Sequence, residues 1–261
     1  MEHGSVDVNV DSADVGQTDV DAVDADAVEA ASVEDQSAAS TVAAVLAVKS
    51  LHRAKSRLAA TLSTVPAGDD PTTHGSLVLG MFLDTIEALR GAGVVRVVVV
   101  SPDDEVLAAA RRAGMQGLRE SPVSGSATAG LNAAFADGAR WARQTWPDSS
   151  RLMFVQADLP AATSRSVGEV VRAARVHPSS FLSDRDGTGT VILHGSTDDA
   201  GAVPRFGPAS AAAHRAAGAV ELDPARHRWA DLRTDVDTAA DLAVARGLGL
   251  GRHTTEALRN L

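Results

Sequence analysis

The chain has 261 residues, a formal net charge of −10 and no cysteine, which excludes disulfide bridges, thiolate metal sites and a cysteine nucleophile. Residues 1–40 hold 11 of the 34 acidic residues and no lysine or arginine, so residues 41–261 are close to neutral. Because no basic patch with interleaved aromatic residues and no run of 18 apolar residues occurs, we expect neither nucleic acid nor a membrane as a partner.

Residues 1–40 consist mostly of Asp, Ala, Val, Ser and Glu in low-complexity order. Such a segment buries too little apolar surface to offset the entropy of ordering it, so we predict a disordered acidic tail. A solubilising role is the default interpretation, and a partner-binding arm is the alternative. The start of the chain lacks the basic-then-apolar order of a signal peptide, and we expect a cytoplasmic protein.

The ordered part is predicted as one domain, residues 41–261, and begins with an apolar strand at residues 42–48. A basic segment with Lys49, Lys55 and Arg57 follows this strand directly. Cationic side chains at this position bind phosphates in nucleotide-binding α/β folds, and the sequence predicts such a role here. The alternative is a solvated basic helix face.

The next stretch alternates helices and strands. A helix is predicted over residues 72–92, a strand over 94–100, a helix up to residue 113 and a short strand near 117–118. Small residues from 121 to 130 then form a loop before a helix at 131–146. Gly130 and Asn132 at this junction predict a pocket for a nucleotide base or ribose, with an ordinary loop as the alternative.

A buried strand at residues 152–156 ends at Asp158, because Pro160 cannot donate to a β-ladder and biases Leu159 away from helix. Open α/β sheets bind ligands at the carboxyl ends of their strands, and Asp158 is therefore a candidate catalytic and metal-binding carboxylate. The alternative is that Asp158 only caps the following turn.

Two segments of small residues follow a helix near residues 164–175. An Asp-Gly turn between residues 181–183 and 191–193 predicts a β-hairpin, and the hydroxyl and glycine residues at 188–190 allow a ligand to approach the backbone. Residues 205–210 lead into a helix that continues to residue 217, with Ser210 near its first turn. A hydroxyl beside helix-start N–H groups suits an anion, and a plain Gly-Pro turn is the alternative.

Asp235 and Asp237 alternate with Val236 after a short strand at 219–222, so on an extended backbone both carboxylates face one way. Two like charges on one side are costly without a cation between them, and carboxylates suit a hard cation such as Mg²⁺. The alternative is that Asp237 caps the helix predicted at 239–246.

Alternating strands and helices predict an α/β sandwich with a mixed, mostly parallel sheet. Neither the GxxxxGK[ST] phosphate loop, nor a GxGxxG after the first strand, nor a GxSxG nucleophile elbow is present.

Several short motifs together resemble one family. They are AVKSLHRAKSRLA (47–59), QADLPA (156–161), SDRDGTGTVIL (183–193), RFGPAS (205–210), AGAVEL (217–222) and LRTDVDTAADL (232–242). In order and spacing they resemble the CofC/FbiD family of phosphoenolpyruvate (2-phospholactate) guanylyltransferases of coenzyme F420 biosynthesis. The resemblance covers about residues 42–250 and implies a three-layer α/β/α nucleotide-diphospho-sugar transferase-like nucleotidyltransferase fold.

The resemblance also implies roles for single residues. It assigns Thr190, Gly207 and Ser210 to phosphoenolpyruvate, and Asp158, Asp235 and Asp237 to Mg²⁺. The implied reaction joins GTP and phosphoenolpyruvate and releases pyrophosphate. The nucleophile is already ionised, so neutralising and aligning two anions is the main task of the enzyme.

Three other functions are compatible with parts of the sequence. 2-Phospho-L-lactate differs from phosphoenolpyruvate by one unsaturation and is the alternative acceptor. A glycosyltransferase would use Asp235-Val236-Asp237 as a metal-holding DxD element, and a nucleotide sensor would bind GTP without consuming it. Members of the family are often dimers, and a homodimer is compatible with the resemblance.

Overall fold

The computed structural model describes residues 1, 41–51, 71–122, 126–197 and 202–260, with the backbone alone for residues 71–74. The predicted disorder of the acidic tail concerns residues outside these ranges and stays a prediction. Within them, no helix has the length and the apolar character needed to cross a bilayer.

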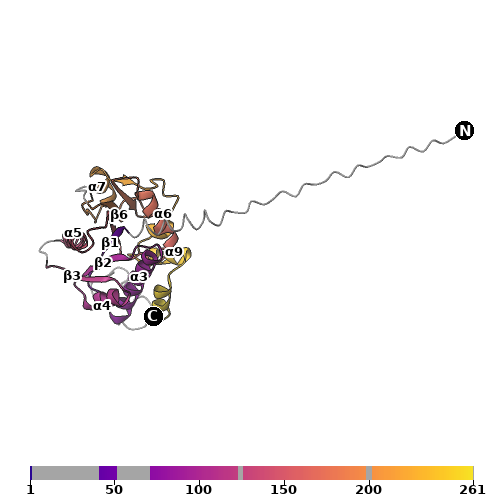
Figure 1. Ribbon diagram of the computed structural model, residues 1–261. Helices are drawn as coiled ribbons and strands as arrows, with labels where there is room; N and C mark the ends of the chain where they lie inside the picture. Colours follow the sequence, from indigo (N-terminus) through magenta and orange to yellow (C-terminus); the bar gives the residue numbers. More distant parts are fainter. Residues whose placement is uncertain (2–40, 52–70, 123–125, 198–201, 261) are drawn as a thin grey trace.

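A seven-stranded sheet with the order β3-β2-β1-β4-β6-β5-β7 organises the described residues (Figure 1). Only β6 runs antiparallel to its neighbours β4 and β5, which confirms the predicted mixed, mostly parallel sheet. The strands are β1 Val42–Ala47, β2 Arg96–Ser101, β3 Gln116–Arg119, β4 Arg151–Val155, β5 Ser179–Ser183, β6 Thr190–Ser196 and β7 Val220–Glu221.

Helices cover both faces of the sheet, because the apolar residues of a central strand point alternately to either side. In β1, Val42, Ala44 and Leu46 join a core cluster with α3, α4, α6 and α9, whereas Ala43 and Val45 join a second cluster with α5 and α7. The helices are α3 Pro71–Gly91, α4 Asp104–Arg112, α5 Ala127–Thr145, α6 Ser164–Ala174, α7 Ser210–Ala216, α8 Ala230–Arg233, α9 Ala239–Leu248 and α10 Arg252–Arg259.

Side-chain caps fix the starts of α5 and α9; α5 begins earlier than predicted, whereas α9 begins at Ala239 as predicted. The hydroxyl of Ser126 accepts a hydrogen bond from the Ala129 N–H at 3.2 Å, so α5 begins at Ala127 and Gly130 lies in its first turn, not in a loop. At α9, Thr238 is the N-cap and forms a capping box with Asp241. The suggestion that Asp237 caps this helix is therefore wrong.

The sequence analysis missed α8 and α10. Helix α10 has only two apolar residues, Ala257 and Leu258, and its buried residue is Thr254, so no apolar pattern marks it in the sequence. Its first turn is capped by Asp84 of α3, whose carboxylate accepts hydrogen bonds from the N–H groups of His253 and Thr254 at 3.0 and 2.8 Å. A cap that comes from a residue about 170 positions away leaves no local pattern in the sequence.

Candidate functional site

One edge of the sheet gathers the candidate residues. The carboxyl ends of β1, β3 and β4 lead into Lys49, Glu120 and Asp158, and β6 begins at the same edge with Thr190 because it runs the opposite way. The N–H of Gln156 donates to the carbonyl of Val191 at 2.9 Å, which fixes the start of β6 beside the end of β4. The fold thus brings segments more than 100 residues apart to one ligand-binding edge.

The three residues assigned to phosphoenolpyruvate lie around the start of α7. The N–H of Ser210 donates to the Gly207 carbonyl, and the N–H of Ala211 donates to the Thr188 carbonyl, both at 3.1 Å. Asp184 holds the turn before Thr190 by accepting hydrogen bonds from the N–H groups of Thr188 and Gly189 at 2.9 and 2.7 Å. The hairpin turn is therefore joined to the start of α7 by one backbone hydrogen bond, that of Ala211.

Gly207 has a structural reason to be glycine. Its φ is +128°, a conformation that side chains strongly disfavour, and an added Cβ would lie 2.5 Å from Cγ2 of Thr128 in α5. The close approach of this backbone to α5 fixes the position of the loop that leads to Ser210.

His214 connects Thr190 to the 205–210 segment. Its Nε2 accepts a hydrogen bond from the Arg205 N–H at 3.0 Å, so the ring hydrogen of the neutral imidazole lies on Nδ1. Nδ1 lies 2.9 Å from the Thr190 hydroxyl oxygen and donates to it. Burial, and secondly the charge of Arg205, lower the pKa of His214 to about 4, which keeps the ring neutral near pH 7. The hydroxyl hydrogen of Thr190 is then available to an acceptor such as a phosphate or carboxylate oxygen.

Asn132 binds this same segment from α5. Its side-chain oxygen accepts a hydrogen bond from the Phe206 N–H at 2.8 Å, and its amide nitrogen donates to the carbonyls of Phe206 and Thr128 at 2.9 and 3.1 Å. Both amide N–H groups therefore bind protein carbonyls in this structure. The nucleotide contact predicted for Asn132 stays a prediction.

A cavity lies beside the N-terminus of α5. This cavity of about 430 Å³ is lined by Lys49, Ser50, Glu120, Gly130 and neighbouring small residues. Its volume falls in the range of roughly 300–1,000 Å³ that is usual for small-molecule sites. Two of the predicted nucleotide-binding residues, Lys49 and Gly130, thus line one cavity, whereas Lys55 and Arg57 lie outside the described residues.

A backbone hydrogen bond links the two segments that carry the predicted metal-binding carboxylates. The N–H of Val236 donates to the carbonyl of Asp158 at 3.1 Å, which aligns the 235–237 segment with the end of β4. Asp235 and Asp237 line a common cavity of about 130 Å³, as expected from their alternation with Val236. Oδ1 of Asp158 is buried.

Asp84, Glu87 and His253 form the one group of acidic and histidine ligand atoms within 4.8 Å of one another among the described residues. Both oxygens of Asp84 accept N–H groups of α10, and Glu87 binds Arg252 at 2.9 Å. These contacts explain the cluster as the junction between α3 and α10.

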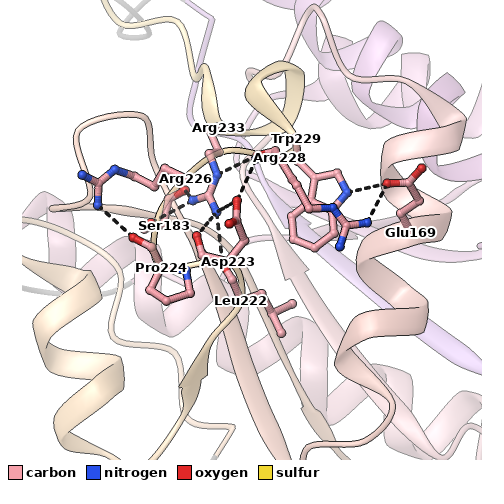
Figure 2. Close-up of polar contacts among 9 residues, drawn as sticks. All are labelled: Glu169, Ser183, Leu222, Asp223, Pro224, Arg226, Arg228, Trp229 and Arg233. Atoms are coloured by element: carbon pink, nitrogen blue, oxygen red, sulfur yellow. Dashed lines mark hydrogen bonds and ion pairs between the residues drawn. The ribbon is translucent and has the colours of Figure 1, made fainter.

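Arg233 is a residue whose role the sequence analysis missed. Its side chain is only 2% exposed, and it donates to the carbonyl of Ser183 at 2.7 Å and to the carbonyl of Asp223 at 2.8 Å (Figure 2). Further hydrogen bonds reach the carbonyls of Leu222 and Arg228. The guanidinium thereby fastens the backbone just before Asp235 to the end of β5.

The loop that Arg233 holds is secured again on its far side. Figure 2 shows Trp229 and Arg228 directed at Glu169 of α6, with the Trp229 ring nitrogen and the Arg228 guanidinium 3.0 and 3.1 Å from the same carboxylate oxygen. The hydrogen bond from Trp229, followed by those from Arg165 and Arg228, lowers the pKa of Glu169 to about 2. Arg233 lies between Leu232 and Thr234, with Asp231 and Asp235 nearby, so no local pattern in the sequence points to its burial.

Known proteins provide the decisive comparison. A MobA-like NTP transferase domain matches residues 80–221. Phosphoenolpyruvate guanylyltransferase of Mycolicibacterium gilvum (strain PYR-GCK) is 41% identical over 215 residues, covering 82% of this chain and 93% of that protein. The protein of the same name from Mycobacterium ulcerans (strain Agy99) is 39% identical over 220 residues, covering 83% and 93%. The chain belongs to the phosphoenolpyruvate guanylyltransferase family.

The family resemblance indicated by the six motifs is thus confirmed. The prediction that the protein is a nucleotidyltransferase is confirmed as well. A solved structure of a proposed nucleotide-diphospho-sugar transferase from Desulfovibrio desulfuricans G20 shares the fold at 16% identity with a TM-score of 0.55, covering 85% of this chain and 95% of that one. In this chain, the NTP transferase domain match at residues 80–221 includes Glu120, Asp158 and the three predicted acceptor residues. Asp235 and Asp237 follow the matched region.

Proposed function

We propose that this protein is a guanylyltransferase of coenzyme F420 biosynthesis that condenses GTP with phosphoenolpyruvate. The products are enolpyruvoyl-2-diphospho-5′-guanosine and pyrophosphate. The observation that carries the proposal is the 41% identity to a phosphoenolpyruvate guanylyltransferase over 82% of the chain. Residues 41–261 form the nucleotidyltransferase domain in this proposal.

The acceptor is held by Thr190, Gly207 and Ser210. The buried hydroxyls of Thr190 and Ser210 serve as donors to the phosphate and carboxylate oxygens of phosphoenolpyruvate, and Gly207 lets its backbone approach the ligand. Support comes from the backbone hydrogen bond of Ala211 in α7 to Thr188 of the hairpin turn and from the contact of Thr190 with His214, which tie the hairpin to α7 before a ligand arrives. Such preorganisation spares the ligand the entropic cost of ordering its site.

The nucleotide is assigned to Lys49, Lys55 and Arg57, which neutralise the triphosphate and the departing pyrophosphate, and to the Gly130–Asn132 region of α5. The cavity next to Lys49 and Gly130 supports this assignment for the base and ribose.

We assign Mg²⁺ to the acidic edge, although the ligand atoms of Asp158, Asp235 and Asp237 do not all lie within 4.8 Å of one another in this structure. Asp235 and Asp237 share one cavity, their segment is bound to the backbone of Asp158, and carboxylate oxygens are the ligands this cation prefers. Asp158, Asp235 and Asp237 would hold it. The cation supplies positive charge to the phosphates, and Asp158 is the carboxylate that we assign to catalysis.

The bond change is a displacement at phosphorus. A phosphate oxygen of phosphoenolpyruvate forms a bond to the α-phosphorus of GTP, and the bond from that phosphorus to the oxygen bridging to the β-phosphate breaks, releasing pyrophosphate. No side chain has to remove a proton, since the attacking oxygen is ionised near pH 7. The protein's own contribution is to align two anions and to exclude water from the reacting phosphorus.

Pyrophosphate release tests this function. The purified protein with Mg²⁺ and GTP should release pyrophosphate when phosphoenolpyruvate is added and not without an acceptor. Release with 2-phospho-L-lactate only would keep the reaction class and change the acceptor. GTP binding without release would favour the sensor, and release of a nucleoside diphosphate from a nucleotide sugar would favour the glycosyltransferase. A homodimer and a cytoplasmic location stay predictions.

A further inference from the structure

The cavity between β1, β3 and α5 contains a carboxylate that the proposed function leaves without a role. Glu120 follows the last residue of β3, and its backbone N–H donates to the Ser101 carbonyl at 3.0 Å, which fixes its place at the ligand-binding edge. Its side chain is half-buried and lines the cavity together with Lys49 and Gly130. A Cβ added to Gly130 would lie 3.8 Å from Oε1 of Glu120, so the carboxylate faces the first turn of α5.

Within the described ranges, no protein group donates a hydrogen bond to this carboxylate, and no cation lies within 4.0 Å of it. Burial raises the pKa of Glu120, and the nearby charge of Lys49 opposes that shift by favouring the ionised form. A half-buried carboxylate of this kind offers two acceptor oxygens side by side. Its complement is a ligand with two adjacent N–H donors, because charge-assisted pairs of parallel hydrogen bonds are the strong ones.

Among the common nucleobases, guanine alone presents that pair. Its ring N1–H and its 2-amino group lie next to each other on one edge. Adenine and cytosine pair an amino group with a ring nitrogen that accepts, and uracil has a single N–H between two carbonyls. We propose that Glu120 selects guanine by accepting hydrogen bonds from both groups.

This inference rests on the proposed function and makes it more specific. Small residues of α5, among them Ala127 and Gly130, line the same cavity as Glu120, whose volume of about 430 Å³ is in the range of small-molecule sites. Guanine specificity then comes from one side chain of the cavity, and the triphosphate extends from the ring toward the end of β1 and Lys49.

The test exchanges the hydrogen-bonding pattern on both sides of the contact. Glu120→Gln replaces one acceptor by an amide donor, so the variant repels the 2-amino group of guanine and suits xanthine, which has a carbonyl at that position. With phosphoenolpyruvate and Mg²⁺, the wild type should use GTP better than inosine triphosphate, which lacks the 2-amino group, by about tenfold to a hundredfold in kcat/KM. In Glu120→Gln this preference should disappear, and xanthosine triphosphate should become a better substrate than GTP.

Glu105→Gln, on the exposed first turn of α4, is the matched control and should keep the wild-type preferences. Gain of activity with xanthosine triphosphate also shows that the variant is folded. An unchanged ratio of GTP to inosine triphosphate in Glu120→Gln would overturn the inference while the proposed function stands. If the wild type released no pyrophosphate, the proposed function would fail, and calorimetric affinities for the same three nucleotides would still decide the role of Glu120.

Discussion

The two sides of the candidate site are built differently. On the acceptor side, Asp184 binds the backbone of its own hairpin turn, and His214, Asn132 and Arg233 bind backbone groups of other segments. The positions of the segments with Thr190, Ser210 and Asp235 are thus fixed by the protein itself. On the nucleotide side, Lys49 is exposed and Glu120 has no protein donor within the described ranges. An acceptor side held by many protein hydrogen bonds, next to a nucleotide side with fewer of them, suits an enzyme that must tell a small acceptor apart from similar anions.

The largest effect should come from Asp158, where the two sides meet. Asp158→Asn removes a charge assigned to the metal and should lower kcat by roughly a hundredfold to a thousandfold, the range seen when one group that stabilises a transition state is lost. Pyrophosphate release at saturating Mg²⁺ measures it. Asp148→Asn is the control, because Asp148 precedes β4 at the opposite edge of the sheet and binds Arg96 there. Near-wild-type turnover of Asp158→Asn would remove this residue from the mechanism.

The hydrogen bonds of Arg233, which fasten the backbone before Asp235 to the end of β5, should contribute to the free energy of unfolding. Arg233→Met leaves four backbone carbonyls and the carboxylate of Asp223 without their donor, and breaking such a buried charged contact costs about 3 kcal/mol or more. Denaturant unfolding should show this loss. Arg165→Met, an exposed residue of α6 that pairs with Glu169, should change the free energy of unfolding by less than about 1 kcal/mol. Equal effects of the two substitutions would contradict a stabilising role of the buried Arg233 contacts.

Acid should lower the free energy of unfolding through two buried histidines. Burial lowers the pKa of His194 in β6 to about 3, with Arg151 adding to the effect, and that of His214 to about 4. Because an unfolded histidine has a pKa of about 6.5, the unfolded chain binds more protons as the pH falls from there toward 4. The free energy of unfolding should therefore fall in this window, by up to ~1.4 kcal/mol per pH unit for each histidine.

His194→Leu isolates one of these contributions. Both ring nitrogens of His194 are buried and have no hydrogen-bond partner among the described residues, so the variant should unfold with a flatter pH dependence between pH 6.5 and 4 than the wild type. Denaturant titrations at several pH values measure the slope, and the exposed His227→Leu should leave it unchanged. If the slope of His194→Leu equalled that of the wild type, His194 would not be a source of acid sensitivity.

The smallest expected effect is a rise in the KM for one of the two substrates. His214→Gln disturbs the hydrogen bonds to Thr190 and to the Arg205 backbone, and should raise the KM for phosphoenolpyruvate by about tenfold while the KM for GTP stays near its wild-type value. His227→Gln serves as the exposed control. A matching rise in both KM values would mean that His214 supports the fold as a whole and not the acceptor pocket.

The sequence carried most of the fold and part of the site. Strands β1, β2 and β4 are short apolar runs, and their positions were predicted to within one or two residues, with Asp158 just after β4, whereas β6 extends three residues beyond its predicted end. His214, Arg233 and the contact of Asn132 could not be predicted, because their partners lie 24, 50 and 74 positions away in the chain. Their neighbours in the sequence contain no trace of these contacts. Glu120 follows a four-residue strand with an irregular burial pattern, and only the cavity makes it conspicuous.

The most direct test of the account is a ³¹P NMR spectrum of the reaction mixture with GTP, phosphoenolpyruvate and Mg²⁺. The account predicts that the phosphoenolpyruvate signal is replaced by a pair of coupled diphosphate signals, one from the GMP phosphorus and one from the enolpyruvoyl phosphorus, together with one equivalent of pyrophosphate. Appearance of GDP and inorganic phosphate in their place, with phosphoenolpyruvate unchanged, would contradict guanylyl transfer.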